Sequence, residues 1–269
     1  MLAKAAGLPA DEVFLDLEDA VAPELKNDET RRAVVAALRG DWTAPTRAVR
    51  VNAVGTPWWQ DDLRAAVEGR AHCVIVPKVE SVGQVEAVAG RLDELGSDAG
   101  LELQIESPRG LVEVEGLAVA SPRVEALLLG PGDYAAAAGM PELTVGAGDA
   151  ERWHYILARI VTAAHAFGLQ AIDGPYGAIR DLEGLRESAQ RSRGLGYDGK
   201  WALNPDQIAV CNEVYSPTAG ELERAEQILA AYAEATEGAV LLDGEMIDEA
   251  SRKMAVAVAE RGRAAGMAR

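Results

Sequence analysis

Two acidic residues, each placed after an apolar stretch, form a candidate metal site in this sequence. Glu106 follows the alternating residues 101–105 and precedes Ser107-Pro-Arg-Gly110, a pattern typical of a helix start. Asp133 lies in Gly130-Pro-Gly-Asp-Tyr-Ala135, a tight turn after a second apolar stretch. Mg²⁺ binds through one or two carboxylates and fills its other positions with water and substrate oxygens. Two acids in these positions suit that ion.

Ion pairing and helix capping account for the same acids without a metal. In that interpretation Glu106 pairs with Arg109 or Arg50, and Asp133 caps a helix. Arg50 alternates with apolar neighbours, so its side chain points to the opposite face of a predicted strand. A guanidinium that faces a barrel interior suits a substrate carboxylate or a developing oxyanion, whereas one paired with an acid is structural. The residues alone leave both interpretations open.

A second group of charged residues lies at the ends of two other predicted strands. Asp16, Glu18 and Asp19 lie within four positions, which fits a solvated loop or carboxylates that hold metal-bound waters. Lys78 follows Pro77 and suits a Schiff base in a barrel, but we favour a lysine that balances several acids.

Short apolar stretches alternate with longer amphipathic ones, which predicts a parallel sheet with helices between its strands. Polar groups follow nearly every strand candidate, and in a barrel all strand C-termini meet at one mouth. A doubly wound sheet would spread these groups along an edge and would more often carry a GxGxxG turn, which is absent after the first candidate. We therefore predict an α/β fold of the TIM (β/α)₈ barrel type. The strand candidates are residues 13–17, 48–52, 73–77, 101–106, 125–130, 169–173 and 200–204.

The strand count is one short of a closed barrel, because seven candidates are present where eight are expected. Residues 1–7 are helix-like, and no strand candidate precedes them. We therefore expect a first strand to be missing from this chain. Helices are predicted at residues 58–68, at residues 81–95 with Ser81 as the N-cap, and at residues 150–167.

After Asn204 the alternation of strands and helices stops. Helices are predicted at residues 206–215, 219–236 and 249–263, with a break at Ser216-Pro-Thr218. We expect a barrel domain over residues 1–215 and a helical C-terminal extension over residues 216–269.

Composition and charge exclude several classes of protein. The formal net charge of −17 leaves the surface without the excess of Lys and Arg that binding to nucleic-acid phosphates requires. No apolar run approaches the length of a membrane span, and the N-terminus lacks the layout of a signal peptide, so we expect a cytoplasmic protein. Cys73 and Cys211 fit buried thiols, and His72, His154 and His165 show no metal-ligand spacing.

A set of motifs along essentially the whole chain resembles the citrate lyase β-subunit-like branch of the HpcH/HpaI aldolase superfamily. The motifs are Asp11-Glu-Val-Phe-Leu-Asp-Leu-Glu-Asp-Ala-Val-Ala-Pro23, Val49-Arg-Val-Asn52, Val76-Pro-Lys-Val-Glu80, Gln104-Ile-Glu-Ser-Pro-Arg-Gly110, Gly130-Pro-Gly-Asp-Tyr-Ala135, Ala171-Ile-Asp-Gly-Pro175 and Tyr197-Asp-Gly-Lys-Trp201. This branch includes malyl-CoA, β-methylmalyl-CoA and citramalyl-CoA lyases and malyl-CoA thioesterases. The resemblance implies a TIM barrel, Mg²⁺ as the cofactor and chemistry on a coenzyme A (CoA) thioester.

The same resemblance implies roles for individual residues. Glu106 and Asp133 would be the metal ligands, and Arg50 would bind the carbonyl or hydroxyl oxygen of the substrate. Glu18 and Asp19 would lie next to these residues and hold them in place without binding the metal themselves.

The resemblance also implies a purpose for the C-terminal extension. Asp248, in Gly244-Glu-Met-Ile-Asp248, matches the acid of a lid that reaches a neighbouring subunit's active site as proton donor or acceptor, so a homo-oligomer is expected, a trimer or a hexamer. Coenzyme contacts are expected at Lys78 and at Asn204-Pro205. Asn204-Pro-Asp-Gln207 stands where His-Pro-x-Gln is usual, so one contact should differ. The missing first strand would remove another part of the coenzyme pocket.

These features predict a Mg²⁺-dependent carbon–carbon lyase that cleaves or forms a 3-hydroxyacyl-CoA such as malyl-CoA, with a short acyl-CoA and glyoxylate or pyruvate as the other partners. Arg50 would stabilise the oxygen that becomes a carbonyl, and Asp248 would protonate the thioester enolate. One alternative is a malyl-CoA-type thioesterase that uses an activated water at the same site. Another is a citrate lyase β-subunit that acts on an acyl-carrier partner.

Overall fold

The computed structural model of this 269-residue chain describes residues 5–141, 144–146, 150–234 and 238–267. It divides into two compact units, Met1–Cys211 and Asn212–Arg269. Within the described residues, no helix is both long enough and apolar enough to cross a bilayer.

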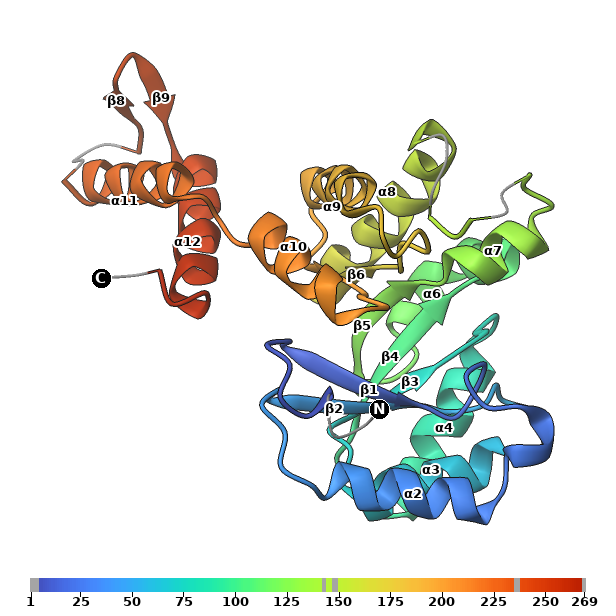
Figure 1. Cartoon of the computed structure of the whole chain (residues 1–269). Helices are drawn as coiled ribbons and strands as arrows, with labels where there is room; N and C mark the ends of the chain where they lie inside the picture. Colours follow the sequence, from blue (N-terminus) through green and yellow to red (C-terminus); the bar gives the residue numbers. More distant parts are fainter. Residues whose placement is uncertain (1–4, 142–143, 147–149, 235–237, 268–269) are drawn as a thin grey trace. The chain divides into compact units, whose positions relative to one another are not determined.

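The first unit is built on one curled parallel sheet, in which each strand pairs with the next one in sequence. Figure 1 shows this sheet with its helices. The strands are β1 (Glu12–Asp16), β2 (Thr46–Arg50), β3 (Cys73–Val76), β4 (Gly100–Ile105), β5 (Val124–Leu129), β6 (Gln170–Asp173) and β7 (Gly199–Lys200). All seven strand candidates and the barrel type of architecture are thereby confirmed.

The ring of strands is open between β1 and β7, which are the edge strands of the sheet formed by the described residues. Phe14 of β1 nevertheless stacks on Trp201, just after β7, with ring centroids 4.7 Å apart. Residues 1–4 of the helix-like segment at residues 1–7 lie outside the described part of the chain. The expectation of a further strand ahead of this chain stays a prediction.

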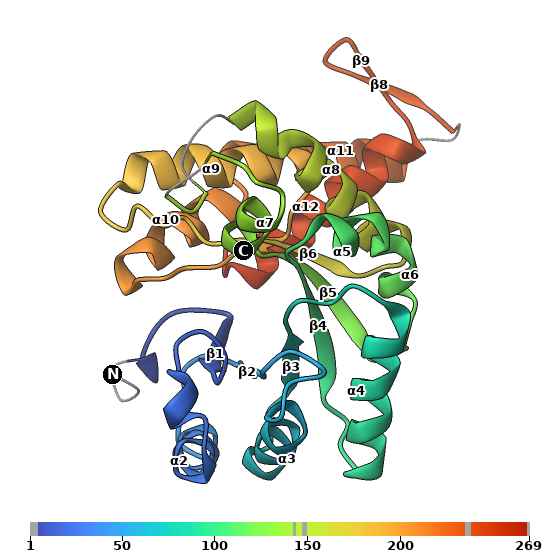
Figure 2. The same cartoon turned by 90° about the vertical axis from the view of Figure 1, so that its right-hand side faces the viewer.

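Helices surround the sheet, and α2, α3 and α4 lie side by side (Figure 1, Figure 2). Ser81 caps α4 as predicted, in a capping box with Gln84. The helical segments are η1 (Pro23–Leu25), α2 (Asp28–Leu38), α3 (Trp59–Gly69), α4 (Val82–Glu94), α5 (Pro108–Val112), α6 (Val114–Ala118), α7 (Pro131–Ala137), α8 (Ala150–Ala166), α9 (Leu182–Leu195) and α10 (Pro205–Tyr215).

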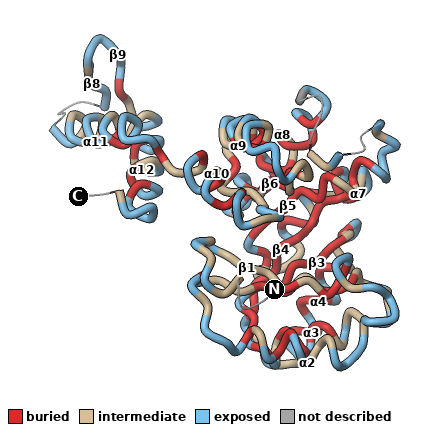
Figure 3. The backbone as a smooth tube through the Cα atoms, viewed as in Figure 1, coloured by how far each residue is buried: buried red, intermediate tan, exposed pale blue. Residues whose placement is uncertain are grey.

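The core lies along the central strands, where β3 and β4 are buried at every position (Figure 3). Burial on both faces explains the nearly continuous apolar runs of these strands. Small and branched side chains fill the space between the strands: Ala48, Cys73, Ile75, Ala126 and Leu128, packed against Phe14, Ile172 and Trp201.

The last strand is shorter than the predicted residues 200–204. Trp201 still donates its backbone N–H to the carbonyl oxygen of Asp173, but Leu203 and Asn204 donate theirs to the side-chain oxygen of Gln207. These bonds turn the chain out of the sheet, and Pro205 starts α10.

Polar side chains also lie inside the unit near the beginnings of the strands. Ligand atoms of Glu12, Cys73 and Glu102 lie within 4.8 Å of one another, and the thiol of Cys73 donates to Glu125 over 3.3 Å. Burial, together with the charge and hydrogen bond of Glu12, raises the pKa of Glu102 well above its usual range. The raised pKa favours the protonated form of Glu102, whose O–H can donate a hydrogen bond to Glu12.

The described residues of the second unit form the end of α10, two further helices and a hairpin, and α11 packs on α12. The elements are α11 (Ala219–Glu234), β8 (Val240–Leu242), β9 (Glu245–Ile247) and α12 (Glu249–Ala264). Asp243 and Gly244 connect the two strands with φ of 51° and 85°, as an Asp-Gly hairpin turn requires. The hairpin was not predicted, because three-residue strands are too short for a periodic pattern to emerge. The last two residues of the helix predicted at residues 219–236 lie outside the described part of the chain.

Candidate active site

Several predicted site residues come together where the parallel strands end, as they do in barrel enzymes. Each strand from β1 to β5 is followed by, or ends in, at least one of them. Ion pairs and hydrogen bonds link Glu18, Asp19, Arg50, Lys78, Glu106 and Asp133 into one group. We call these six residues the mouth cluster.

Arg50 ends β2 and pairs with Asp16 on the neighbouring β1 through two parallel bonds. Its Nε lies 2.9 Å from Oδ1 of Asp16, and its Nη2 lies 2.6 Å from Oδ2. Nη1 is directed toward Oε2 of Glu18, at 3.3 Å. Burial acts to raise the pKa of Asp16, but the hydrogen bond and charge of Arg50 outweigh it and lower that pKa. The pair keeps Asp16 ionised and fixes the plane of the guanidinium.

Lys78 places a positive charge among the acids of the mouth cluster. Its Nζ lies 2.7 Å from Glu18, 3.6 Å from Asp19 and 3.7 Å from Asp133. Burial acts to lower the pKa of Lys78, but the hydrogen bond and charge of Glu18 raise it overall. A Schiff-base lysine needs a lowered pKa. The structure therefore favours the charge-balancing interpretation of this residue.

Glu106 is almost completely buried, with 2% of its surface exposed. Its Oε1 accepts the backbone N–H of Lys78 at 2.5 Å, and its Oε2 accepts the side-chain amide of Gln104 at 2.6 Å. Burial and the nearby charges of Glu18 and Asp133 raise its pKa to about 8. A divalent cation at this position would replace the proton that these surroundings favour.

Gly130 makes room for the Glu106 carboxylate on the neighbouring strand end. A Cβ atom at Gly130 would lie 2.5 Å from Oε2 of Glu106 and 2.8 Å from the amide nitrogen of Gln104. No side chain fits there, which explains the glycine at the start of the Gly130-Pro-Gly-Asp turn.

The donor set of the mouth cluster fits a hard divalent cation such as Mg²⁺. Its candidate ligands are carboxylate oxygens, and Asp133 is 44% exposed, which leaves space for water and substrate oxygens. Oε2 of Glu18 is buried and accepts no hydrogen bond from a described residue. Four acids, Asp16, Glu18, Asp19 and Asp133, pair with only two basic side chains, those of Arg50 and Lys78. Negative charge is therefore in excess here, and a cation would balance it.

The alternative pairings expected for the acids are not found in the structure. Arg109 pairs with Glu113 at 2.9 Å, and Arg50 pairs with Asp16, so neither is the partner of Glu106. Asp133 lies in the first turn of α7 and is not its N-cap, which is Gly130.

Three further predicted residues make local bonds of their own. Asn204 accepts the backbone N–H of Asp206 at 3.0 Å, and Pro205 follows it as the first residue of α10. Asp248 belongs to the second unit, where its side chain accepts the backbone N–H of Ser251 at 3.0 Å as the N-cap of α12. These bonds from Ser251 lower the pKa of Asp248.

Sequence reasoning missed the partners of these side chains. Gln104 on β4 precedes Glu106 by two residues, so strand alternation places both side chains on one face. This two-residue spacing was a signal from which Gln104 could have been identified as a partner of Glu106. Trp201 lies 5.8 Å from the Arg50 guanidinium, across the opening between β1 and β7. No local pattern joins these two residues, because the contact depends on how the sheet curls.

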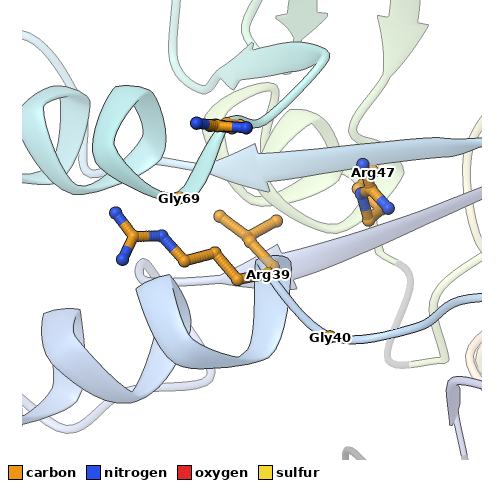
Figure 4. Close-up of a pocket in the computed structure, with 6 residues that line it drawn as sticks. Arg39, Gly40, Arg47 and Gly69 are labelled. Carbon is orange, nitrogen blue, oxygen red and sulfur yellow. The ribbon is translucent and has the colours of Figure 1, made fainter.

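A pocket of about 520 Å³ lies at the opposite ends of the strands. Leu38, Arg39, Gly40, Arg47, Gly69 and Arg70 line it, and Arg39 and Arg47 flank Gly69 (Figure 4). Arg39 bonds to the backbone oxygen of Glu68 at the end of α3. The pocket contains no residue of the mouth cluster, so it is not the candidate active site.

The sequence profile of the HpcH/HpaI aldolase/citrate lyase family matches residues 1–205. The chain belongs to this family. It is 36% identical to the L-malyl-CoA/β-methylmalyl-CoA lyase of Rhodobacter capsulatus, over 94% of this chain and 87% of that protein. It is 35% identical to a (3S)-malyl-CoA thioesterase of Cereibacter sphaeroides, over 92% of this chain and 85% of that protein.

A solved structure of another protein has a similar fold. It is the CitE protein of Mycobacterium tuberculosis in complex with magnesium, acetoacetate and coenzyme A. The TM-score is 0.77 at 31% identity, over 94% of this chain and 90% of that one. The family resemblance inferred from the motifs is thereby confirmed.

Proposed function

We propose that this HpcH/HpaI protein is a Mg²⁺-dependent carbon–carbon lyase that cleaves or forms a 3-hydroxyacyl-CoA thioester of the malyl-CoA type. The observation that carries the proposal is the mouth cluster, in which Arg50, Glu106 and Asp133 lie at the same end of the sheet, where β2, β4 and β5 finish. The names of the relatives support the substrate class, and the magnesium and coenzyme A of the CitE complex support the cofactor and the thioester.

The residues of the cluster divide the work of cleavage. Glu106 and Asp133 would hold Mg²⁺, which supplies a Lewis acid for the substrate's carboxylate and hydroxyl oxygens. Arg50 would direct Nη1 at the oxygen that becomes the aldehyde or keto carbonyl, because its other two nitrogens, Nε and Nη2, bond to Asp16. Glu18 and Asp19 would keep Arg50 and Lys78 in place.

The reaction needs one proton at the carbon next to the thioester. In cleavage the hydroxyl proton would pass to a water molecule, the carbon–carbon bond would break, and its electrons would form the thioester enolate. Asp248 in its acid form would protonate that enolate. In condensation its carboxylate would remove the same proton.

We further propose that residues 216–269 act as a lid on a neighbouring subunit of a cytoplasmic homo-oligomer, a trimer or a hexamer. Asn204 and Pro205 are proposed coenzyme contacts, since they follow β7 on the same side of the sheet as the other strand ends. Lys78 is the third proposed coenzyme contact, because 42% of its side chain is exposed and can be reached by a ligand.

An assay of the purified protein tests this function. Malyl-CoA, β-methylmalyl-CoA and citramalyl-CoA are supplied separately, and release of glyoxylate or pyruvate is followed with Mg²⁺ and with EDTA. We expect Mg²⁺-dependent release from at least one thioester, and loss of it in Glu106→Gln and Asp133→Asn. Absence of metal-dependent turnover on all three would refute the proposal.

The thioesterase relative favours a second candidate function, hydrolysis of malyl-CoA. A water molecule activated in the same cluster would attack the thioester carbonyl carbon. Product analysis separates the two functions, because hydrolysis gives malate and free CoA, whereas cleavage gives glyoxylate and acetyl-CoA.

A further inference from the structure

Gln104 is a polar residue inside the barrel with an unusual balance of hydrogen bonds. It lies on β4 with 3% of its surface exposed. Its Nε2 donates to Oε2 of Glu106 at 2.6 Å. Its Oε1 is buried and has no hydrogen-bond partner among the described residues.

Hydrogen-bond chemistry fixes the direction of this amide. An ionised Glu106, the form that binds a metal, can only accept hydrogen bonds. The amide must therefore turn its NH₂ group toward Glu106 and its oxygen away. The unpaired oxygen follows from the bond that Gln104 makes to Glu106.

Stability does not explain a glutamine at this position. A buried carbonyl oxygen without a donor destabilises the folded state, whereas an apolar side chain of the same shape would not. Gln104 shares its strand face with Glu102 and Glu106, and no described residue donates a hydrogen bond to its Oε1. A residue kept at a cost in stability points to a functional use.

The geometry of Glu106 indicates that use. Gln104 holds one carboxylate oxygen, and the backbone N–H of Lys78 holds the other. Lys78 has φ of 54°, a left-handed conformation that side chains other than glycine rarely adopt. Together with the close approach of Gly130, these two donors fix the carboxylate plane.

We propose that Gln104 is a positioning residue, whose amide donor fixes the carboxylate of Glu106 in the orientation that binds a divalent cation. This inference rests on the proposed function, in which Glu106 is a metal ligand. Residues that hydrogen-bond to a metal ligand without touching the metal orient that ligand. Loss of such a hydrogen bond typically weakens metal binding by about 10- to 100-fold.

The variant Gln104→Met tests the inference, because methionine keeps the length of the side chain and removes both the donor and the unpaired oxygen. The full-length protein is titrated with Mn²⁺ by electron paramagnetic resonance and with Mg²⁺ by calorimetry, and its melting temperature is measured without metal. We expect metal binding weakened by about 10- to 100-fold. We also expect a melting temperature equal to or above that of the wild type.

Gln207 provides a matched control, because it is a fully buried glutamine with all its groups bonded. Its Nε2 donates to the carbonyl oxygen of Tyr176, and its Oε1 accepts the N–H groups of Leu203 and Asn204. Gln207→Met should lower the melting temperature and leave Mn²⁺ affinity unchanged. The two variants should thus change stability and metal affinity in opposite ways.

Each other outcome is decisive. Wild-type affinity for Mn²⁺ in Gln104→Met would overturn the inference and leave the proposed function standing. A Gln104→Met protein that fails to fold, or melts well below the wild type, would show a structural role and also overturn it. A wild-type protein that binds neither Mn²⁺ nor Mg²⁺ would overturn the proposed function, and this inference with it.

Discussion

Arg50 donates hydrogen bonds from Nε and Nη2 to the two carboxylate oxygens of Asp16, at 2.9 and 2.6 Å. The third nitrogen, Nη1, does not bond to Asp16. Nη1 lies 3.3 Å from Glu18. The ion pair and the proposed substrate contact are therefore compatible, because each uses a different part of the same side chain. The two interpretations that the sequence left open for Arg50 need not compete.

The first prediction concerns this division of donors. Arg50→Lys cannot reproduce the two-pronged bond to Asp16 and a third contact at once, because an ammonium group is a compact point charge. We expect a fall in kcat of about 10²–10³-fold, the usual effect of removing one donor to a developing oxyanion. Thioester cleavage assays measure it, with Arg64→Lys as the control on an exposed arginine that pairs with Asp61. Near wild-type turnover in Arg50→Lys would contradict the proposed role.

The second prediction concerns the ammonium group of Lys78, as distinct from its backbone N–H. Lys78→Met removes a positive charge from the mouth cluster, so Mg²⁺ should bind more tightly, by roughly threefold to tenfold for charges several ångströms apart near a protein surface. Lys78→Gly should bind Mg²⁺ as tightly as Lys78→Met does. Glycine tolerates the positive φ and keeps the backbone N–H that bonds to Glu106.

Calorimetry with Mg²⁺ measures both Lys78 variants. Lys26→Met is the control, because the partner of Lys26 is Asn52 and not an acid of the mouth cluster. Weaker Mg²⁺ binding in Lys78→Met would mean that the ammonium supports the metal site instead of opposing it.

The third prediction concerns the buried acid pair near the beginnings of the strands. Burial and Glu12 raise the pKa of Glu102 in the folded state, so the folded protein holds a proton that the unfolded chain releases above about pH 4.5. Stability from this group is complete below that pH and is lost as the pH rises toward the folded-state pKa. Glu102→Gln keeps a donor for Glu12 without an ionisable group.

Thermal unfolding between pH 5 and pH 9 tests the Glu102 prediction. Glu102→Gln should melt at a higher temperature than the wild type at pH 8, by about 2–4 °C for each kcal/mol gained, and the difference should shrink toward pH 5. The exposed Glu86→Gln is the control and should follow the wild type. A difference that does not depend on pH would argue against titration of Glu102.

The fourth prediction concerns the proposed lid. If Asp248 serves the active site of a neighbouring subunit, oligomers mixed from Glu106→Gln and Asp248→Asn chains will contain sites with both residues intact. Random mixing at equal amounts should restore about a quarter of wild-type activity, although each variant alone is inactive. Activity is measured after the two proteins are unfolded and refolded together. No recovery would indicate that Asp248 acts within its own chain or not at all.

The strands and the polar residues at their ends could be predicted from the sequence, because both depend on local pattern. Apolar runs such as residues 73–76 and 101–105 are short and bounded by polar groups, and the parallel topology brings their ends together. This was sufficient to place Glu106, Asp133, Arg50 and Lys78 in one group before their contacts were known.

The contacts themselves could not be predicted, because they depend on distances between strands. Differences of one or two ångströms decide whether Arg50 pairs with Asp16 or with Glu106. They also decide where the ammonium of Lys78 lies, and no rule of sequence spacing encodes them. The positive φ of Lys78 is a further example, since nothing in Pro77-Lys-Val79 announces a left-handed residue.

The strictly sequential order of the strands has a consequence for how the first unit folds. Every strand of this sheet bonds to the one that follows it in the chain, so each sheet contact joins two consecutive strand–helix units. The entropy lost in closing each loop is then modest, and the sheet can grow by adding one strand and its helix at a time. The mouth cluster draws on the first five strands only, so we expect a fragment that lacks β6 and β7 to contain all of its side chains in their sheet order.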